Sequence, residues 1–147
     1  MKLLAALDLS NSTPAVLREA RAWARRLSAE LILIHVAEPD PDFIGRGAGL
    51  ESTRLAVAHK FQRAQQQIEV LAVELRKDGL DATALLLQES DIADTILREA
   101  ERLHADAILM GTHARGAARA MFIGSISKQV LLKATRPVVL IPPRDTP

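Results

Sequence analysis

The residues best suited to chemistry lie between Gly111 and Ser127, where an apolar run gives way to a helical pattern. Gly111 and Gly116 allow the backbone to approach a ligand closely or to adopt positive φ. Gly124 and Ser125 stand where a helix is expected to begin, and the free N–H groups and dipole there favour an anion. Two arginines in the same segment add positive charge. The segment is typical of a phosphate site, and a plain connector with turn-forming glycines is the alternative.

Two better-known phosphate loops do not match. The Gly111–Gly116 spacing fits a Walker A loop, but two alanines follow where Lys and Ser or Thr are required. The dinucleotide fingerprint belongs after the first strand, and the segment from Asp8 to Ser12 contains no glycine. A third glycine series, from Gly45 to Gly49, leads into no clearly capped helix, so we interpret it as a loop.

Asp8 is the candidate carboxylate, because it ends the first apolar run. It could meet a ribose hydroxyl or a metal bound to phosphates, or it could form an Asx-type turn with the residues that follow. The four histidines do not share metal-ligand spacing. His113 lies in the glycine-flanked segment and is the one expected near a ligand, whereas His35 lies in an apolar strand and is interpreted as a core residue. The Ser125-x-x-Lys128 match to a nucleophile pattern lacks its companion motifs.

Composition narrows the class of protein. The chain has 147 residues, which is typical of a single domain, predicted here over 1–147. It has no cysteine, which excludes disulfides and thiolate chemistry, and fits a reducing compartment. A net charge of +1 and only 3% aromatic residues argue against nucleic acid as a partner. No apolar run is long enough for a membrane span or a signal peptide, so a cytoplasmic protein without membrane contact is expected.

Short apolar runs alternate with segments of helical periodicity. The continuous runs predict buried parallel strands and the periodic segments predict helices on both faces, a doubly wound α/β fold. Thr13 and Asp91 are expected N-caps, and Gly79 is expected to close the second helix. Five strands admit two common orders, 3-2-1-4-5 and 2-1-3-4-5, and both place ligands beyond the carboxyl ends of the strands. The predicted strands are 3–7, 31–36, 84–87, 107–110 and 138–141, and the predicted helices are 14–27, 61–75, 92–103 and 125–134.

Four segments together resemble the universal stress protein family over nearly the whole chain. The first is Ala6-Leu7-Asp8-Leu9-Ser10, like the family's strand–Asp–x–Ser turn, and the second is Leu33-Ile34-His35-Val36. The third is Ala105 to His113, and the fourth is Gly124 to Ser127, followed by Arg136 to Ile141. The resemblance implies a five-stranded Rossmann-like sheet in the order 3-2-1-4-5. It also implies a homodimer through the last strand, with Val138, Val139, Leu140 and Ile141 at the interface.

The resemblance further implies an adenine-nucleotide site for ATP or another adenylate, with Mg²⁺ or Mn²⁺ at Asp8. Adenine would lie near Ala6 and Val36, ribose near Asp8 and Gly111, and phosphates over the loop after the fourth strand and the start of the last helix. The family's second loop glycine is replaced here by Ala114. Alanine keeps its N–H for a phosphate, but a positive φ there costs about 1–2 kcal/mol. The implied nucleotide-binding residues are Ala6, Asp8, Val36, Gly111, Thr112, His113, Ala114, Arg115, Gly116, Ala117, Gly124, Ser125, Ile126 and Ser127.

Three functions follow from these observations. The first is a homodimeric regulatory protein of the stress response that binds an adenine nucleotide. The second, which follows from the alanine at position 114, is a dimeric interaction module of the same fold that works without nucleotide. The third is an enzyme with slow ATP hydrolysis at most, because no Walker lysine and no positioned general base are evident. No catalytic residue is assigned.

Overall fold

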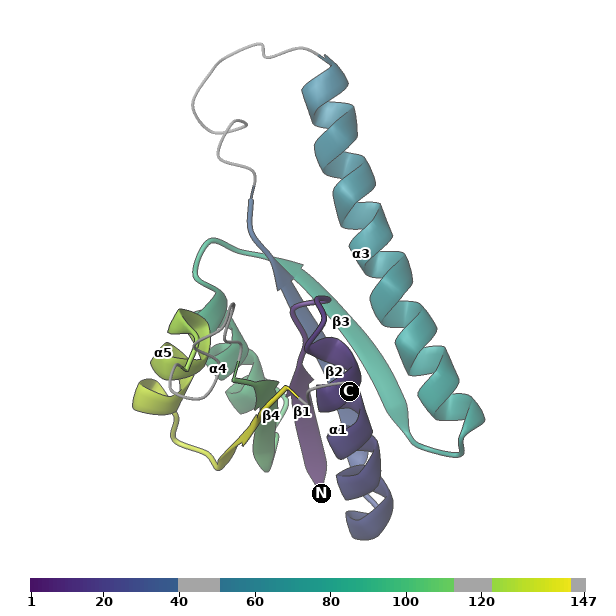
Figure 1. Cartoon of the computed structure of the whole chain (residues 1–147), viewed down its shortest axis with the longest axis vertical. Coiled ribbons are helices and arrows are strands. Elements are labelled where there is room, and N and C mark those ends of the chain that lie inside the picture. Colours follow the sequence, from purple (N-terminus) through teal and green to yellow (C-terminus); the bar gives the residue numbers. More distant parts are fainter. Residues whose placement is uncertain (40–50, 113–122, 144–147) are drawn as a thin grey trace.

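The computed structural model describes residues 1–39, 51–112 and 123–143, and in that part of the chain five parallel strands form one sheet (Figure 1). The strand order is β3-β2-β1-β4-β5, which confirms the order implied by the family resemblance. The two central crossovers diverge at β1 and β4, so the topological switch point lies between these strands. The strands are β1 (Lys2–Ala6), β2 (Glu30–Ala37), β3 (Ala82–Gln88), β4 (Ala107–Gly111) and β5 (Val138–Ile141).

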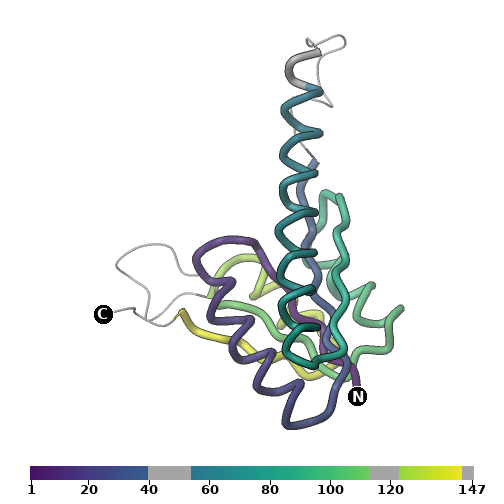
Figure 2. Tube along the Cα trace, turned by 90° about the vertical axis from the view of Figure 1, so that its right-hand side faces the viewer, coloured from purple at the N-terminus to yellow at the C-terminus, as the bar shows by residue number. Residues whose placement is uncertain are grey.

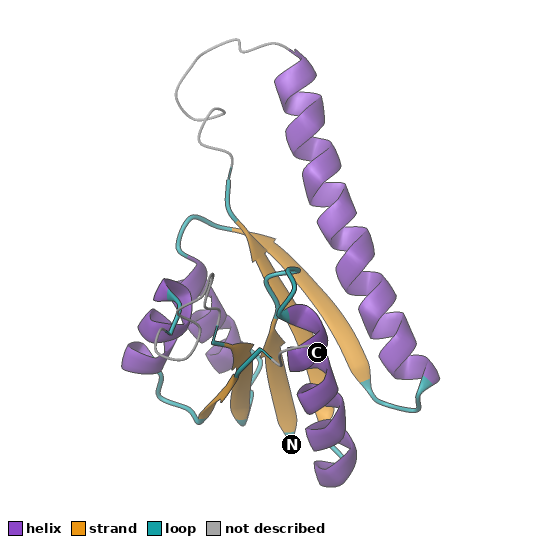
Figure 3. Ribbon diagram, viewed as in Figure 1, coloured by secondary structure: helices purple, strands orange, loops and turns teal. Residues whose placement is uncertain are grey.

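Helices cover both faces of the sheet, as the continuous apolar strands predict (Figure 3). Helices α1 (Thr13–Leu27) and α3 (Glu51–Lys77) cover one face, and α4 (Ile92–Arg102) and α5 (Ser125–Lys133) cover the other. Neighbouring residues of each strand point to opposite faces. Leu3 therefore joins the core beneath α1 and α3, whereas Leu4 joins the core beneath α4 and α5.

Capping residues and glycine in the sequence predicted most helix ends correctly. The Asp91 side chain accepts a hydrogen bond from the backbone N–H of Asp94 at 2.9 Å, so it is the N-cap of α4 as predicted. Gly79 has a φ of +81°, which confirms that it closes the second predicted helix. The N-cap of α1 was predicted wrongly: Ser12 occupies the cap, and Thr13 is already helical and buried.

Helix α3 is much longer than its predicted segment. It begins at Glu51, well before Phe61, and runs for 27 residues. Only its C-terminal half, with Ile68 and Leu75, is buried against the sheet. The N-terminal half projects beyond the rest of the fold (Figure 2). Because that half does not pack on the core, it carries no clear apolar period, and periodicity could not reveal it.

In the described part of the chain, no helix is both long and apolar enough to cross a bilayer.

Candidate functional site

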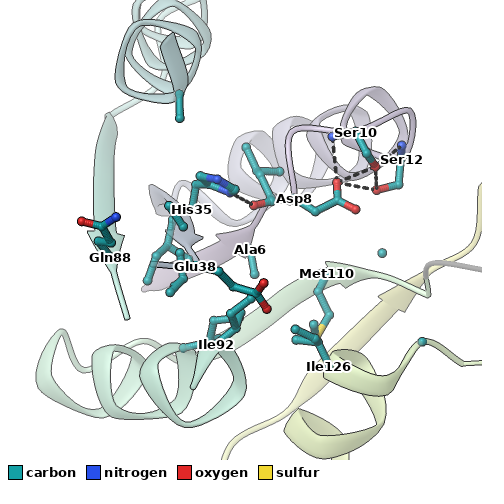
Figure 4. Close-up of a pocket in the computed structure, with 18 of the residues that line it drawn as sticks. Ala6, Asp8, Ser10, Ser12, His35, Glu38, Gln88, Ile92, Met110 and Ile126 are labelled. Atoms are coloured by element: carbon teal, nitrogen blue, oxygen red, sulfur yellow. Dashed lines mark hydrogen bonds between the residues drawn. The ribbon is translucent and has the colours of Figure 1, made fainter. Parts of the chain in front are cut away.

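A cavity of about 630 Å³ opens at the carboxyl ends of β1, β2 and β4 (Figure 4). This volume lies in the range of small-molecule sites, and the position is the switch point where doubly wound folds bind ligands. The start of α5 forms one side of the cavity, and the N-terminal half of α3 forms another. The lining side chains and backbone belong to Ala6, Leu7, Asp8, Ser10, Ser12, Ile34, His35, Val36, Ala37, Glu38, Pro39, Val57, Lys60, Phe61, Ala64, Gln88, Ile92, Ile96, Met110, Gly111, Gly124, Ser125, Ile126 and Ser127.

The turn after β1 is organised around the Asp8 carboxylate. One of its oxygens, Oδ1, accepts three hydrogen bonds: from the backbone N–H of Ser10 at 3.0 Å, from the Ser10 hydroxyl at 2.7 Å and from the Ser12 hydroxyl at 3.0 Å (Figure 4). This is the Asx-type turn, one of the two roles considered for Asp8 from the sequence. Leu9, inside the turn, has a φ of +56°, a conformation that costs a non-glycine residue about 1–2 kcal/mol. The turn therefore holds an exposed carboxylate in one orientation at the rim of the cavity.

Gly111 ends β4 beside this turn. A Cβ atom on Gly111 would lie 3.3 Å from the Ser12 hydroxyl oxygen and 3.6 Å from a methyl group of Val16. Because these contacts would be tight, glycine at position 111 allows β4 to approach the start of α1 closely. The Gly111 carbonyl accepts a hydrogen bond from the Ser127 hydroxyl at 2.8 Å, and Ser127 is buried. Gly111 thus links the Asp8 turn to the first turn of α5.

The N-terminus of α5 presents donors to the cavity. Gly124 is the N-cap and supplies no side-chain acceptor to the first turn. Its N–H donates to the Thr112 carbonyl at 2.7 Å, and its carbonyl accepts from the N–H of Lys128 at 2.9 Å. By helix geometry the N–H groups of Ser125, Ile126 and Ser127 have no acceptor within the helix. This end of α5 is suited to an anionic group.

The structure brings together every predicted site residue that it describes except one. Thr112 is the exception: its N–H donates to the Ile141 carbonyl at 3.0 Å, and it does not line the cavity. The eight that line it are Ala6, Asp8, Val36, Gly111, Gly124, Ser125, Ile126 and Ser127. The predictions for His113, Ala114, Arg115, Gly116 and Ala117 fall outside the described residues, as does the glycine series from Gly45 to Gly49.

Several lining residues were not predicted as part of a site. His35 donates a hydrogen bond from Nδ1 to the Leu7 carbonyl at 2.7 Å, so it is satisfied as expected, yet it is half-buried and borders the cavity. Ser10 and Ser12 could have been found from the polar run after Asp8. Lys60 and Phe61 could not, because only the path of α3 brings them over the sheet.

The residues present offer few ligands for a metal. Within the described ranges, no group of three or more His, Cys, Asp or Glu side chains is arranged to hold an ion. A divalent cation at this site would therefore need other oxygen ligands beside a protein carboxylate. Mg²⁺ is commonly bound in that way, through one or two carboxylates and the phosphates of a substrate.

The family follows from a match along the chain. The sequence model described as the Universal stress protein family matches residues 1–142. The chain belongs to this family. A universal stress protein of Thermus aquaticus is 32% identical over 139 residues, covering 95% of this chain and 96% of the relative. The resemblance seen in the four sequence segments is thereby confirmed.

Solved structures share the fold. A universal stress family protein from Burkholderia pseudomallei superposes with a TM-score of 0.75 at 24% identity, covering 96% of this chain and 95% of that one. A universal stress protein from Archaeoglobus fulgidus in complex with dAMP gives a TM-score of 0.65 at 24% identity, covering 96% and 97%. A universal stress protein in complex with cAMP gives 0.63 at 16% identity, covering 98% of each chain. These likenesses establish the Rossmann-like architecture.

Proposed function

We propose that this protein is a homodimeric regulatory protein of the stress response that binds an adenine nucleotide in the cavity at the switch point. One observation carries the proposal: the Asp8 turn and the free N–H groups of α5 border the same cavity, across the carboxyl ends of β1 and β4. The hydroxyl groups of a sugar can donate hydrogen bonds to the Asp8 carboxylate. An anionic phosphate can accept hydrogen bonds from the N–H groups of α5. The complexes of two family members with dAMP and cAMP support an adenylate as the ligand.

The cavity offers a different surface to each part of a nucleotide. Ala6, Val36 and Met110 provide an apolar floor for a base. The Asp8 carboxylate, held by its serines, is placed to accept hydrogen bonds from ribose hydroxyls. The first turn of α5 would receive the phosphates, together with the loop residues 113–117 predicted from the sequence. Mg²⁺ or Mn²⁺, if bound, would be held by Asp8 and the phosphates jointly.

The direct test is the nucleotide content of the purified protein. Protein denatured immediately after purification should release an adenine nucleotide, identified by chromatography and mass spectrometry. Calorimetric titration of nucleotide-free protein with AMP and ATP, with and without Mg²⁺, should then show saturable binding. Phosphate release measured in the same samples separates binding from slow hydrolysis. The absence of binding at millimolar nucleotide would contradict the proposal.

The proposed dimer rests on β5. This strand is at the edge of the sheet, and its residues Val138 to Leu140 are only half-buried. The carbonyls of Pro137 and Ile141 accept hydrogen bonds from the N–H groups of Ile108 in β4 and of Thr112 directly after β4, at 2.9 and 3.0 Å. Because strand residues alternate in direction, the N–H groups of Val138 and Leu140 face away from β4. An apolar edge with free donors is suited to pairing with a second copy.

Substitution of an outward N–H tests this interface. Wild-type protein should elute in light-scattering chromatography at about twice the chain mass of 16.0 kDa. The Val138→Pro variant removes one outward donor and should shift the mass toward the monomer, because proline is tolerated only on an unpaired edge. Circular dichroism checks that the variant folds. A dimer of unchanged affinity would show that β5 is not the interface.

A dimeric interaction module that works without nucleotide is the second candidate. It is favoured by the exposed apolar side chains of α5, where Leu131 is 44% and Leu132 75% exposed. A tight dimer in material that contains no nucleotide and binds none would support this candidate over the first.

A further inference from the structure

Glu38 follows directly on β2 and its side chain enters the cavity. The Ala37 carbonyl accepts a hydrogen bond from the N–H of Glu89 at 3.1 Å, so the backbone at Glu38 is tied to the end of β3. From this anchor the Glu38 carboxylate extends over Ile92 toward Met110 and Ile126 (Figure 4). A charged group therefore lies over the apolar floor that a base would occupy.

The two carboxylates of the cavity differ in their partners. Asp8 already receives three hydrogen bonds on one oxygen. Glu38 makes no hydrogen bond and no ion pair with any residue that the structure describes. A ligand can therefore use the Glu38 carboxylate without breaking an internal contact. An ionised carboxylate only accepts hydrogen bonds, so a ligand must offer a donor at this position.

We propose that Glu38 selects the base, by accepting a hydrogen bond from the exocyclic 6-amino group of adenine. This inference rests on the proposed nucleotide site and adds a discriminating residue to it. A 6-oxo purine would instead place an oxygen against the carboxylate, two acceptors with no hydrogen between them. Two facing acceptors repel each other, and this repulsion disfavours the 6-oxo analogue.

Lys60 and Gln88 also line the cavity. Lys60, on α3, is a donor and would favour a 6-oxo group, the opposite preference. Gln88 lies at the end of β3, across the cavity from Met110 and Ile126 (Figure 4). In Figure 4 the Glu38 carboxylate lies close to Met110 and Ile126, whereas Gln88 lies away from them. The geometry therefore favours an amino-bearing base.

The test compares AMP with inosine 5′-monophosphate, which carries oxygen in place of the 6-amino group and a hydrogen on N1. Calorimetry on the wild-type protein should give a Kd for AMP at least about tenfold lower than for the inosine nucleotide, as expected for one hydrogen bond to a charged acceptor. In the Glu38→Gln variant this ratio should fall toward 1, because an amide can donate to the oxygen as well as accept from the amine. Glu89→Gln is the matched control, since Glu89 pairs with Arg98 at 3.5 Å and does not line the cavity.

Each outcome decides between the two proposals. Binding of neither nucleotide would overturn the nucleotide site itself, and with it this inference. Binding of AMP with a wild-type ratio near 1, or with a ratio unchanged in Glu38→Gln, would overturn the role of Glu38 and leave the nucleotide site standing. A preference for the inosine nucleotide that disappears in Lys60→Met would assign base selection to Lys60 instead. A ratio lost in Glu38→Gln and kept in Glu89→Gln supports the proposal.

Discussion

The two ends of the sheet are built differently. At the amino end, connections are short and closed by hydrogen bonds: Lys2 N–H donates to the Asp106 carboxylate at 2.7 Å, and Arg136 donates to the Ala105 carbonyl at 2.6 Å. At the carboxyl end, the turn after β1 and the start of α5 instead border a cavity. The switch of strand order at β1 and β4 places the cavity there, because α1 and α5 pack on opposite faces of the sheet. Closed turns thus occupy one end of the sheet and the cavity the other.

Helix α3 extends from the amino end of the sheet to the carboxyl end. Its two halves therefore differ in the same way as the two ends of the sheet. Its C-terminal half contributes Ile68, Ala72 and Leu75 to the core. Its N-terminal half stands beyond the sheet, and Val57 and Phe61 border the cavity. Substitutions in the two halves should therefore affect different properties of the protein.

The largest expected effect is on stability. Leu75→Ala removes a side chain that is 1% exposed and should lower the free energy of unfolding by about 2–5 kcal/mol, measured by urea denaturation. Phe61→Ala, in the half-buried wall of the cavity, should cost less stability and weaken AMP binding instead. Equal losses of stability in the two variants would remove the distinction between the halves.

Asp8→Ala should weaken AMP binding more than it lowers stability, unlike Leu75→Ala. Asp8 is exposed but its carboxylate accepts three hydrogen bonds, so stability should fall by about 0.5–1.5 kcal/mol, less than in Leu75→Ala. The loss of hydrogen bonds from ribose to a charged acceptor should weaken AMP binding by about 1.5–3 kcal/mol, measured by calorimetry. Asp106→Ala is the control at the amino end, where the carboxylate accepts from Lys2 and lies far along β4 from the cavity. If AMP affinity survives in Asp8→Ala, this carboxylate does not bind the ligand.

Positive φ angles offer a finer comparison. Ser28, at the C-cap of α1, has a φ of +49°, and Leu9 in the Asp8 turn has a φ of +56°. Ser28→Gly should raise the free energy of unfolding by about 0.5–1 kcal/mol, because glycine adopts this conformation without strain. Leu9→Gly also removes strain, but it deletes a side chain packed on the core and loosens the turn, so AMP affinity should fall. Thermal denaturation and calorimetry on both variants measure the difference, and a gain in AMP affinity for Leu9→Gly would refute it.

The smallest effect concerns an ion pair away from both ends. Lys133 donates to the Asp94 carboxylate at 2.7 Å and joins α5 to α4. This hydrogen bond lowers the pKa of Asp94 below 3.8 and raises the pKa of Lys133 above 10.5. The contribution of Asp94 to stability is present above its unfolded pKa and is lost as the pH falls through the lower folded value. The contribution of Lys133 is present below 10.5 and is lost as the pH rises through its raised value.

Lys133→Met tests this pair. The pKa of Asp94, followed by carboxyl NMR titration, should rise toward its usual value in the variant. The return should be incomplete, since Asp91 and Arg98 also lower it. An unchanged titration would show that the pair is not formed in solution. Because both groups are exposed at the surface, salt should weaken the effect.

Most elements could be predicted from local pattern. Continuous apolar runs marked the five strands, and Asp91 and Gly79 marked helix ends through side-chain capping and positive φ. The extent of α3 could not be predicted, because its N-terminal half has no core to impose a period. Strand order also remained open between two arrangements on pattern alone, since both bury the same residues. The family resemblance chose between them, and the register of β1 with β2 and β4 agrees.

The Asp8 turn, the glycine at the end of β4 and the start of α5 can be predicted from sequence, because each depends on residues close together in the chain. That these three segments border one cavity follows from the tertiary structure, because parallel pairing aligns the carboxyl ends of strands far apart in sequence. The tertiary structure also decided that Glu38 and α3 border the cavity, which no local pattern indicates. The chemical groups of each segment depend on neighbouring residues in the chain. Their assembly into one site depends on the order in which the strands pair.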